Sequence, residues 1–283
     1  MKKQGAGKAT LEMLRSFCAM ASDLNLSRAA QRLGLTRQTI RRHIQLMEKS
    51  RGEKLFELRN KTYFLTDAGR NALAAAESIT AEGMAWLHGQ YDIKDGLQHV
   101  RIRTATGEPH FLSSQHELTR IWRDGEPILQ QALQCWCAGK GAIESREFAP
   151  VRPYILVFRR FRNEWLCSEI GEKSALAIWY GWEWAKSSIG RPVEDIPTSN
   201  AHSEYILDAY EKVRCTGAPR LDHQFRIIAR KSGGRALPMA YQRLLLASRF
   251  PDGGPALVSV VKLTDAVDIA GLEQKFLKKA NPV

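Results

Sequence analysis

Residues 26–48 read LSRAAQRLGLTRQTIRRHIQLME, and this stretch decides the fold of the first part of the chain. It holds two apolar stripes at helical spacing, one on each side of Gly34. The stripes are Ala29, Ala30 and Leu33 before the glycine and Ile40, Ile44 and Met47 after it. Gly34 can end the first helix in the left-handed conformation, and Thr36 is a favourable N-cap for the second. The pattern predicts a helix-turn-helix.

The second helix of this pair carries a different set of side chains on its other face, all of which can donate hydrogen bonds. These residues are Arg37, Gln38, Arg41, Arg42 and Gln45. Arginine can bind the O6 and N7 atoms of guanine, and glutamine can bind adenine in the same two-bond manner. A basic, solvated helix face is the other interpretation. The turn, the small alanines and the absence of acidic residues from the face together favour DNA binding.

The positive charge of the chain is concentrated in the same region. The net charge is +12 over 283 residues. Residues 1–70 hold fifteen Lys and Arg against six Asp and Glu, a net +9, and residues 71–283 supply only the remaining +3. This distribution predicts an acidic partner, such as DNA, for the N-terminal part.

The composition also indicates a cellular location. An apolar content of 44% is sufficient for a sizeable core. No apolar run is long enough to span a bilayer, and the basic start of the chain lacks the apolar core of a signal peptide. The five cysteines show no disulfide rhythm, which fits a reducing compartment. We therefore expect a cytoplasmic, nucleoid-associated protein without membrane contact.

Two further elements are expected to follow the helix-turn-helix. Residues 54–66, KLFELRNKTYFLT, form two short strands around a basic tip, and Arg59 and Lys61 at this tip would reach the minor groove. An ordinary solvated hairpin tip is an equal alternative. Residues 67–93 then form a long linker helix, which either pairs with a second copy or packs on its own chain. We favour pairing, because a single recognition helix needs a dimer for affinity. The dimerisation stripe consists of Leu73, Ala76, Ile79, Gly83, Trp86 and Leu87.

A specific set of residues is distributed over positions 10–90. The set consists of Leu14, Phe17, the Ser27–Ala30 run, Leu33, Ile44, Met47, Glu48, Gly52, the Leu55–Glu57 run and the Leu65–Gly69 run. It resembles the winged helix-turn-helix and linker helix of LysR-type transcription regulators. The resemblance implies a homodimer, or a tetramer, that reads an inverted repeat of double-stranded DNA, with RNA polymerase as a further partner. Arg41, Gln38 and Leu58 depart from the residues usual in the family, so no operator sequence can be transferred.

The pattern changes after residue 93. Residues 94–117 are expected to be a linker, residues 118–139 a helical segment, and residues 266–283 a C-terminal helical tail. Strands are expected at 154–161, 163–170, 221–231, 236–250 and 256–263, with helices at 175–184 and 202–213. Two strands, short helices and three antiparallel strands is the order of a PAS domain.

Several short motifs carry the same similarity. They are Ile189–Asp195, Tyr210, Thr216–Pro219, Tyr241–Leu246 and the Asp252–Gly253 turn. Residues 118–265 thus resemble the PAS-like sensor family found in α-proteobacterial proteins. The resemblance implies a five-stranded antiparallel sheet with flanking helices that senses a signal, dimerises, or does both. The usual LysR effector domain needs repeated βα units and more residues than follow here.

A PAS fold can leave a pocket between its helices and its sheet. Candidate lining residues are Trp179, Tyr180, Trp182, Trp184 and Tyr205. The commoner outcome is that such rings simply fill the core. No cofactor is predicted apart from an unidentified small molecule in such a pocket. Cys135 and Cys137 supply at most two ligands, so no metal site is predicted.

The sequence therefore predicts an α+β protein with two domains. The segments are a winged helix-turn-helix over 1–66, a linker and dimerisation helix over 67–93, a linker over 94–117, a PAS-like domain over 118–265 and a tail over 266–283. The expected function is that of a LysR-type, sequence-specific regulator. A DNA-binding protein of architectural type, without sequence preference, is the alternative. An enzyme is not expected, because residues 95–265 contain no recognised catalytic motif. The predicted DNA contacts are Ser27, Arg28, Thr36, Arg37, Gln38, Thr39, Arg41, Arg42, Gln45, Arg59 and Lys61.

Overall fold

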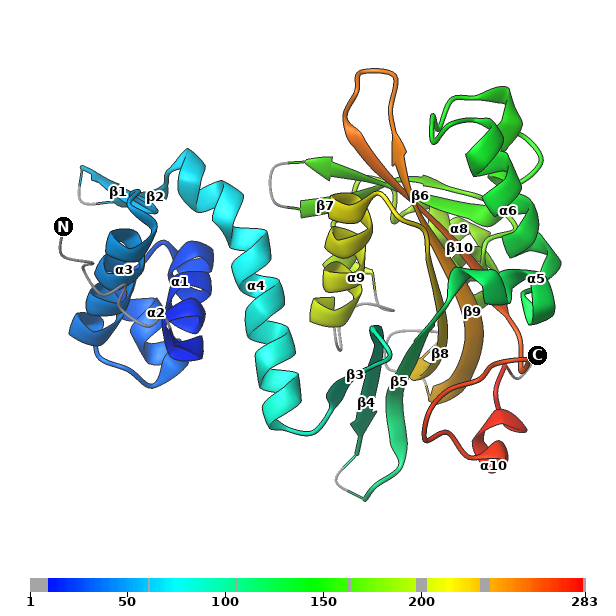
Figure 1. Ribbon diagram of the computed structural model, residues 1–283, viewed down its shortest axis with the longest axis horizontal. Coiled ribbons are helices and arrows are strands. Elements are labelled where there is room, and N and C mark those ends of the chain that lie inside the picture. Colours follow the sequence, from blue (N-terminus) through cyan, green and yellow to red (C-terminus); the bar gives the residue numbers. More distant parts are fainter. Residues whose placement is uncertain are drawn as a thin grey trace. The chain divides into compact units, whose positions relative to one another are not determined.

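The computed structural model describes residues 10–60, 62–104, 106–161, 164–196, 203–229 and 235–281 (Figure 1). The chain divides into two compact units, Met1–Leu87 and His88–Val283. The first unit is helical with a small hairpin, and the second is an antiparallel sheet with helices on both faces. The predicted two-domain α+β class is confirmed. Within the described ranges, no helix combines the length and the hydropathy that crossing a membrane requires.

The N-terminal unit follows the predicted order of elements. It consists of α1 (Leu11–Asp23), α2 (Leu26–Leu33), α3 (Arg37–Arg51), β1 (Phe56–Arg59), β2 (Thr62–Leu65) and α4 (Asp67–Leu87). Asn25 caps α2 by accepting a hydrogen bond from the Ser27 N–H at 2.9 Å, and Thr36 caps α3 by accepting from the Thr39 N–H at 3.1 Å. Gly34 ends α2 at φ 65°, a conformation that costs other residues more. The roles predicted for Gly34 and Thr36 are confirmed.

The hairpin formed by β1 and β2 is the wing of the unit. The core of this unit lies between α1, α3, the wing and the first half of α4. Phe17 and Ile40 are completely buried in it, and the small Ala29 lets α2 approach closely. Phe17 also meets the ring of Phe56 edge-on, with the ring centroids 5.6 Å apart. Because the predicted apolar stripe of α3 faces this core, its polar face must point outward.

The C-terminal unit is built on one eight-stranded sheet in which every strand pair is antiparallel. The strands are β3 (Tyr91–Lys94), β4 (Leu97–Arg103), β5 (Pro109–His116), β6 (Ile155–Phe161), β7 (Glu164–Ile170), β8 (Arg220–Ala229), β9 (Ala236–Arg249) and β10 (Pro255–Leu263). Their order across the sheet is β3-β4-β5-β8-β9-β10-β6-β7. The last three strands in sequence, β8, β9 and β10, are long and pair with one another in antiparallel order, as predicted.

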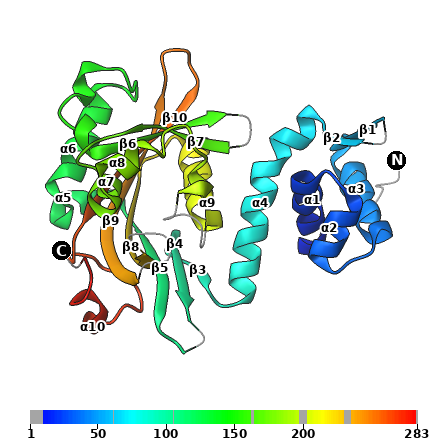
Figure 2. The same cartoon turned by 180° about the vertical axis from the view of Figure 1, so that it is seen from behind.

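Helices cover the two faces of this sheet, as Figures 1 and 2 show from opposite sides. One face packs against α5 (Ile121–Asp124) and α6 (Pro127–Ala138). The other packs against α7 (Ala175–Tyr180), α8 (Trp182–Lys186) and α9 (Ser203–Thr216). Because successive strand residues point to opposite faces, Leu244 and Leu246 join the first core and Leu245 joins the second. Short 3₁₀ turns at Leu118–Arg120, Arg146–Phe148, Arg152–Tyr154 and Val193–Asp195 connect these elements.

Residues 94–117 are not the predicted linker, and the sheet has three strands more than the predicted five. Asp95 and Gly96 both have positive φ and form the tight turn between β3 and β4. Val100 and Ile102 alternate on β4 and are buried. The glycines of this stretch are hairpin turn residues, and the prediction mistook them for the residues of an irregular segment.

The predicted C-terminal helical tail is also wrong, except for the single turn α10 (Gln274–Leu277). The segment after β10 runs across the face of the sheet that carries α5. Its Ile269 and Leu277 pack on Leu112 and Phe225 of β5 and β8. The apolar residues of this segment therefore bind it to the sheet as an extended chain, and they do not form one face of a helix.

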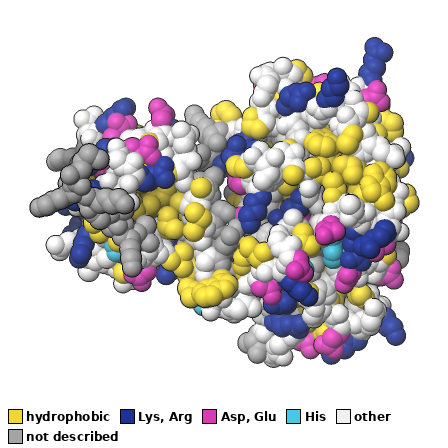
Figure 3. Space-filling model, in the orientation of Figure 1, with side chains coloured by type: hydrophobic (Ala, Val, Ile, Leu, Met, Phe, Trp, Pro, Cys, Tyr) yellow, Lys and Arg dark blue, Asp and Glu magenta, His cyan; other side chains and the backbone are white. Residues whose placement is uncertain are grey.

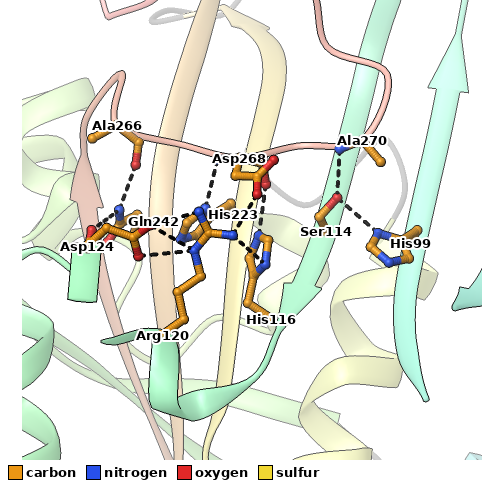
Figure 4. Close-up of polar contacts among 10 residues, drawn as sticks. All are labelled: His99, Ser114, His116, Arg120, Asp124, His223, Gln242, Ala266, Asp268 and Ala270. Carbon is orange, nitrogen blue, oxygen red and sulfur yellow. Dashed lines mark hydrogen bonds and ion pairs between the residues drawn. The ribbon is translucent and has the colours of Figure 1, made fainter. Parts of the chain in front are cut away.

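Polar contacts fix this C-terminal segment to the sheet (Figure 4). The backbone N–H of Asp268 donates to Nδ1 of His223 at 2.9 Å, and its carbonyl accepts from Nε2 of His116 at 2.8 Å. The side chain of Gln242 donates to the carbonyl of Ala266 at 2.6 Å. The two imidazole rings lie 4.2 Å apart between their centroids. His223 accepts through Nδ1 and is therefore neutral, and so is His116, whose Nδ1 accepts from Nη1 of Arg120 at 3.2 Å.

Candidate nucleic-acid interface

The exposed face of α3 is the candidate interface. Arg37, Gln38, Arg41, Arg42 and Gln45 are all exposed, whereas Thr39 is half-buried. The opposite face of the same helix is buried in the core of the unit. The helix is therefore held by its apolar stripe and presents three guanidinium groups and two amides to solvent. Such groups have the geometry needed to read base edges.

A groove brings most of the predicted contacts together. It lies between the start of α2, the face of α3 and the wing. Its lining residues are Leu24, Asn25, Leu26, Ser27, Arg37, Gln38, Arg41, Arg42, Gln45 and Tyr63. Among these described residues none is acidic, so the groove favours an anionic partner. Sequence reasoning missed Tyr63, whose place between Thr62 and Phe64 on an alternating strand was the available signal.

The start of α3 borders a second hollow, on the side of α1. Thr36, Thr39, Gln38 and Arg42 line it together with His43 and residues at the start of α1. His43 is joined to Ser16 of α1 by a 2.7 Å hydrogen bond between Nδ1 and Oγ. This bond helps to fix α3 on α1. The hydroxyl of Thr36 already caps its helix, so Thr36 contributes chiefly by ordering the first turn of α3.

The wing offers a weaker contact than the helix. Arg59 is exposed at the end of β1, but its guanidinium forms an ion pair with Glu57 at 2.7 Å. Lys61, the other predicted wing contact, lies outside the described residues. Ser27 and Arg28 at the start of α2 are exposed, and their N–H groups are bonded to Asn25. Contacts from these two residues to phosphate would therefore use their side chains.

The predicted dimerisation stripe of α4 is divided between two environments. Leu73 and Ala76 are buried in the core of their own unit, and a Cβ at Gly83 would lie 3.0 Å from Leu11 of α1. Leu73 and Ala76 therefore cannot form a surface for another chain, which corrects the prediction for them, and the half-buried Gly83 lies against α1. Ile79, Trp86 and Leu87 are 54%, 68% and 61% exposed. Hydrophobic side chains reach the surface near the end of α4 in Figure 3.

The predicted aromatic pocket of the C-terminal unit is only partly correct. A cavity does lie between the sheet and the helices α7 and α9, and Trp179 lines it. Trp182 is 37% exposed, and Trp184 stacks on Tyr180 with the ring centroids 4.3 Å apart. Tyr205 is buried against Phe111 and fills core space. The local pattern could not show which of these rings point inward. Among the described residues, no cluster of His, Cys, Asp or Glu could hold a metal ion.

Comparison with known proteins finds similarity to bacterial regulators, and the family match lies in the N-terminal unit. Residues 11–70 match the family model described as the bacterial regulatory helix-turn-helix protein, LysR family. The HTH-type transcriptional regulator TtuA of Agrobacterium vitis is 37% identical over 59 residues, which are 21% of this chain and 19% of TtuA. The HTH-type transcriptional activator CmpR of Synechocystis is 31% identical over 110 residues, 37% of this chain and 34% of CmpR.

Among solved structures, a LysR-family transcriptional regulator from Eggerthella lenta is 36% identical. The match covers 22% of this chain and 94% of that one, with a TM-score of 0.21. The chain spans about a fifth of the length of TtuA and about a third of the length of CmpR. By its family match, the segment of residues 11–70 is a helix-turn-helix domain of the LysR family of bacterial regulators.

Proposed function

We propose that this chain is a sequence-specific transcription regulator of the LysR type that binds double-stranded DNA. The observation that carries the proposal is the exposed face of α3, where three arginines and two glutamines line a groove without a described acidic residue. The LysR-family match over residues 11–70 supports the same function.

Each part of the interface has a distinct role in this proposal. Arg37, Gln38, Arg41 and Arg42 read base edges in the major groove and contact nearby phosphates. Ser27 and the first turn of α2 hold the phosphate backbone, which positions the protein without specifying sequence. The wing adds a flanking contact, which Glu57 weakens by neutralising Arg59.

A homodimer on an inverted repeat completes the proposed mode of binding. The exposed Ile79, Trp86 and Leu87 support pairing of α4 with a second copy, because burying large apolar side chains stabilises association. Two copies related by a twofold axis would present two α3 helices to two half-sites. The residues of α4 that face α1 keep each helix fixed on its own reading unit.

The C-terminal unit is proposed to be a PAS-like domain that senses a signal or contributes to dimerisation. The strand order β7-β6-β10-β9-β8 supports this proposal. The β6-β7 hairpin lies beside β10, the last strand in sequence, and the helices α7, α8 and α9 lie between β7 and β8 in sequence. The strands β3 to β5 extend the sheet beyond β8. A ligand in this unit changes DNA binding only if it binds two dimer arrangements with different affinity.

The proposal is tested by recovering the chromosomal sites that the full chain binds and measuring its affinity for them. The expected result is an inverted-repeat site that random duplex does not displace at equal concentration. Affinity should fall steeply as salt rises, because phosphate contacts release counterions. Equal competition by random duplex would reject sequence-specific binding, and a flat salt response would reject the α3 interface.

A further inference from the structure

The cavity of the C-terminal unit differs in chemistry between its two walls. The wall formed by α7, the Val193–Asp195 turn and α9 is mainly apolar, with Leu176, Ile196 and Ile206. The wall formed by the sheet is polar at four positions. These are Arg226 on β8, Tyr241 and Arg243 on β9 and Ser259 on β10. None of the described lining residues is acidic.

Arg243 belongs to a buried triad that carries one more positive charge than negative charges. Asp222 accepts from Nη2 of Arg243 at 2.7 Å and from Nε of Arg220 at 2.8 Å. The exposed fractions are 0% for Asp222, 5% for Arg243 and 7% for Arg220. Both arginines stay charged, so two guanidinium groups share one carboxylate and leave one positive charge inside the protein. Such an unbalanced buried charge is costly unless an anion or further hydrogen bonds offset it.

Among the described residues, no second carboxylate bonds directly to either arginine of this triad. Arg220 also donates to the neutral amide oxygen of Gln98 at 2.7 Å. Asp208, the next buried carboxylate, already forms an ion pair with Lys212 at 2.9 Å. The bonds from Arg243 to Asp222 use its Nε and Nη2 atoms. In the described part of the chain no group accepts from its Nη1, which leaves that end of the guanidinium for a ligand.

Tyr180, which packs against the cluster of the lining residues Trp179, Met239 and Tyr241, has a hydroxyl with unused bonding capacity. The hydroxyl of Tyr180 is buried, and within the described residues it has no hydrogen-bond partner. Burial raises the pKa of this hydroxyl to about 12, so it stays protonated and can donate. The ring packs with the apolar residues around Met239 and Tyr241.

The size of the cavity limits the ligand. The cavity volume is about 80 Å³, whereas an apolar cavity of about 150 Å³ accepts benzene. The ligand must therefore be smaller than benzene. It must also present an apolar part to the helices and an acceptor-rich part to the sheet.

We propose that this cavity binds a short-chain organic carboxylate, with its anionic head on Arg243 and its hydrocarbon part against α7 and α9. The inference rests on the proposed sensory role of the C-terminal unit and names the class of signal. The charge of the triad selects the anion, and the volume excludes larger acids. Of the predicted aromatic set, this site uses Trp179 in its lining and Tyr180 next to it.

The test uses acetate and its uncharged isostere acetamide, titrated into the full chain by calorimetry at constant ionic strength. Acetate should bind saturably and roughly tenfold or more tightly than the amide, because hydrogen bonds to a charged group are stronger. Benzoate should fail to bind. Equal affinity for acid and amide would overturn the assignment of an anion site, and the absence of acetate binding would overturn the proposal.

Variants separate the cavity from the rest of the surface. Ala175→Leu, on the α7 wall, should abolish acetate binding, whereas Ile178→Leu, exposed on the same helix, should leave it unchanged. Arg220→Gln leaves one guanidinium for one carboxylate and should reduce the preference for acid over amide toward one. DNA binding is measured on the same samples. A chain that binds its DNA site but not acetate rejects only the proposed ligand, and one that binds acetate but no DNA rejects only the proposed regulatory function.

Discussion

The carboxylate of Glu48 in α3 accepts a hydrogen bond from the backbone N–H of Leu55 at 3.0 Å. The same oxygen accepts from the N–H of Phe56 at 3.3 Å, and the other oxygen pairs with Lys54 at 2.7 Å. Glu48 is only 8% exposed. The helix α3, the proposed recognition helix, therefore also fixes the start of the wing. One buried side chain couples the two parts of the proposed DNA interface.

Glu48→Ala should lower the free energy of unfolding by about 2 kcal/mol, because it leaves buried backbone donors without an acceptor. The wing should also lose its fixed position on α3. Chemical denaturation followed by circular dichroism measures the first effect. The control is Glu53→Ala, which removes an exposed ion pair with Arg51 and should change stability little. Equal effects of the two substitutions would contradict the anchoring role of Glu48.

A second prediction separates the two sides of α4. Leu73→Ala empties part of the core and should cost about 2–5 kcal/mol of stability. Ile79→Glu changes an exposed position and should leave the unfolding curve nearly unchanged while it shifts the chain toward monomer. Sedimentation velocity and chemical denaturation measure the two effects. A dimer that survives Ile79→Glu would show that this face of α4 is not the pairing surface.

A third prediction concerns the acid side of the stability curve. Burial, followed by the neighbouring His116 and Arg120, lowers the pKa of His223 from 6.5 to about 4. Asp124 and Asp268 act in the opposite direction but are outweighed. Below pH 6.5 the unfolded chain binds a proton that the folded chain rejects. Stability should therefore fall between pH 6.5 and about 4, by about 3 kcal/mol in total.

The measurement is denaturation followed by tryptophan fluorescence at several pH values, since six of the seven tryptophans lie in the C-terminal unit. His223→Gln should remove most of the slope in this interval, and His88→Gln, at an exposed position, should keep it. If the wild-type chain and His223→Gln lose stability in parallel, the histidine is not responsible.

The parts of the molecule that could be predicted are those set by neighbouring residues. Thr36, Gly34 and the stripe of Ile40 and Ile44 define the recognition helix within a dozen residues. Local pattern also located β6 to β10, and glycine pairs at 233–234 and 253–254 of the sequence separate the last three of these apolar runs. The direction in which a polar helix face points follows directly from the direction of its apolar face.

The parts that could not be predicted depend on residues far apart in sequence. Leu112 pairs with Phe225 across β5 and β8, and nothing near either residue indicates this partner. Asp222 meets Arg243 only because β8 and β9 pair in a particular register. In α4, the sequence showed that a stripe exists but not that α1 covers Leu73. Long-range packing thus decided both the extended sheet and the division of the dimerisation stripe.

The most direct test of the account compares the affinity of Arg41→Ala and Arg51→Ala for the selected DNA site. Both substitutions remove one positive charge from α3, but Arg41 lines the groove, whereas Arg51 ends the helix in an ion pair with Glu53. If Arg41 binds a base edge, its loss should weaken binding by about 1–3 kcal/mol and relax preference at one position of each half-site. Arg51→Ala should leave affinity and preference nearly unchanged. Identical affinities and footprints for the two variants would contradict the claim that this face of α3 reads DNA.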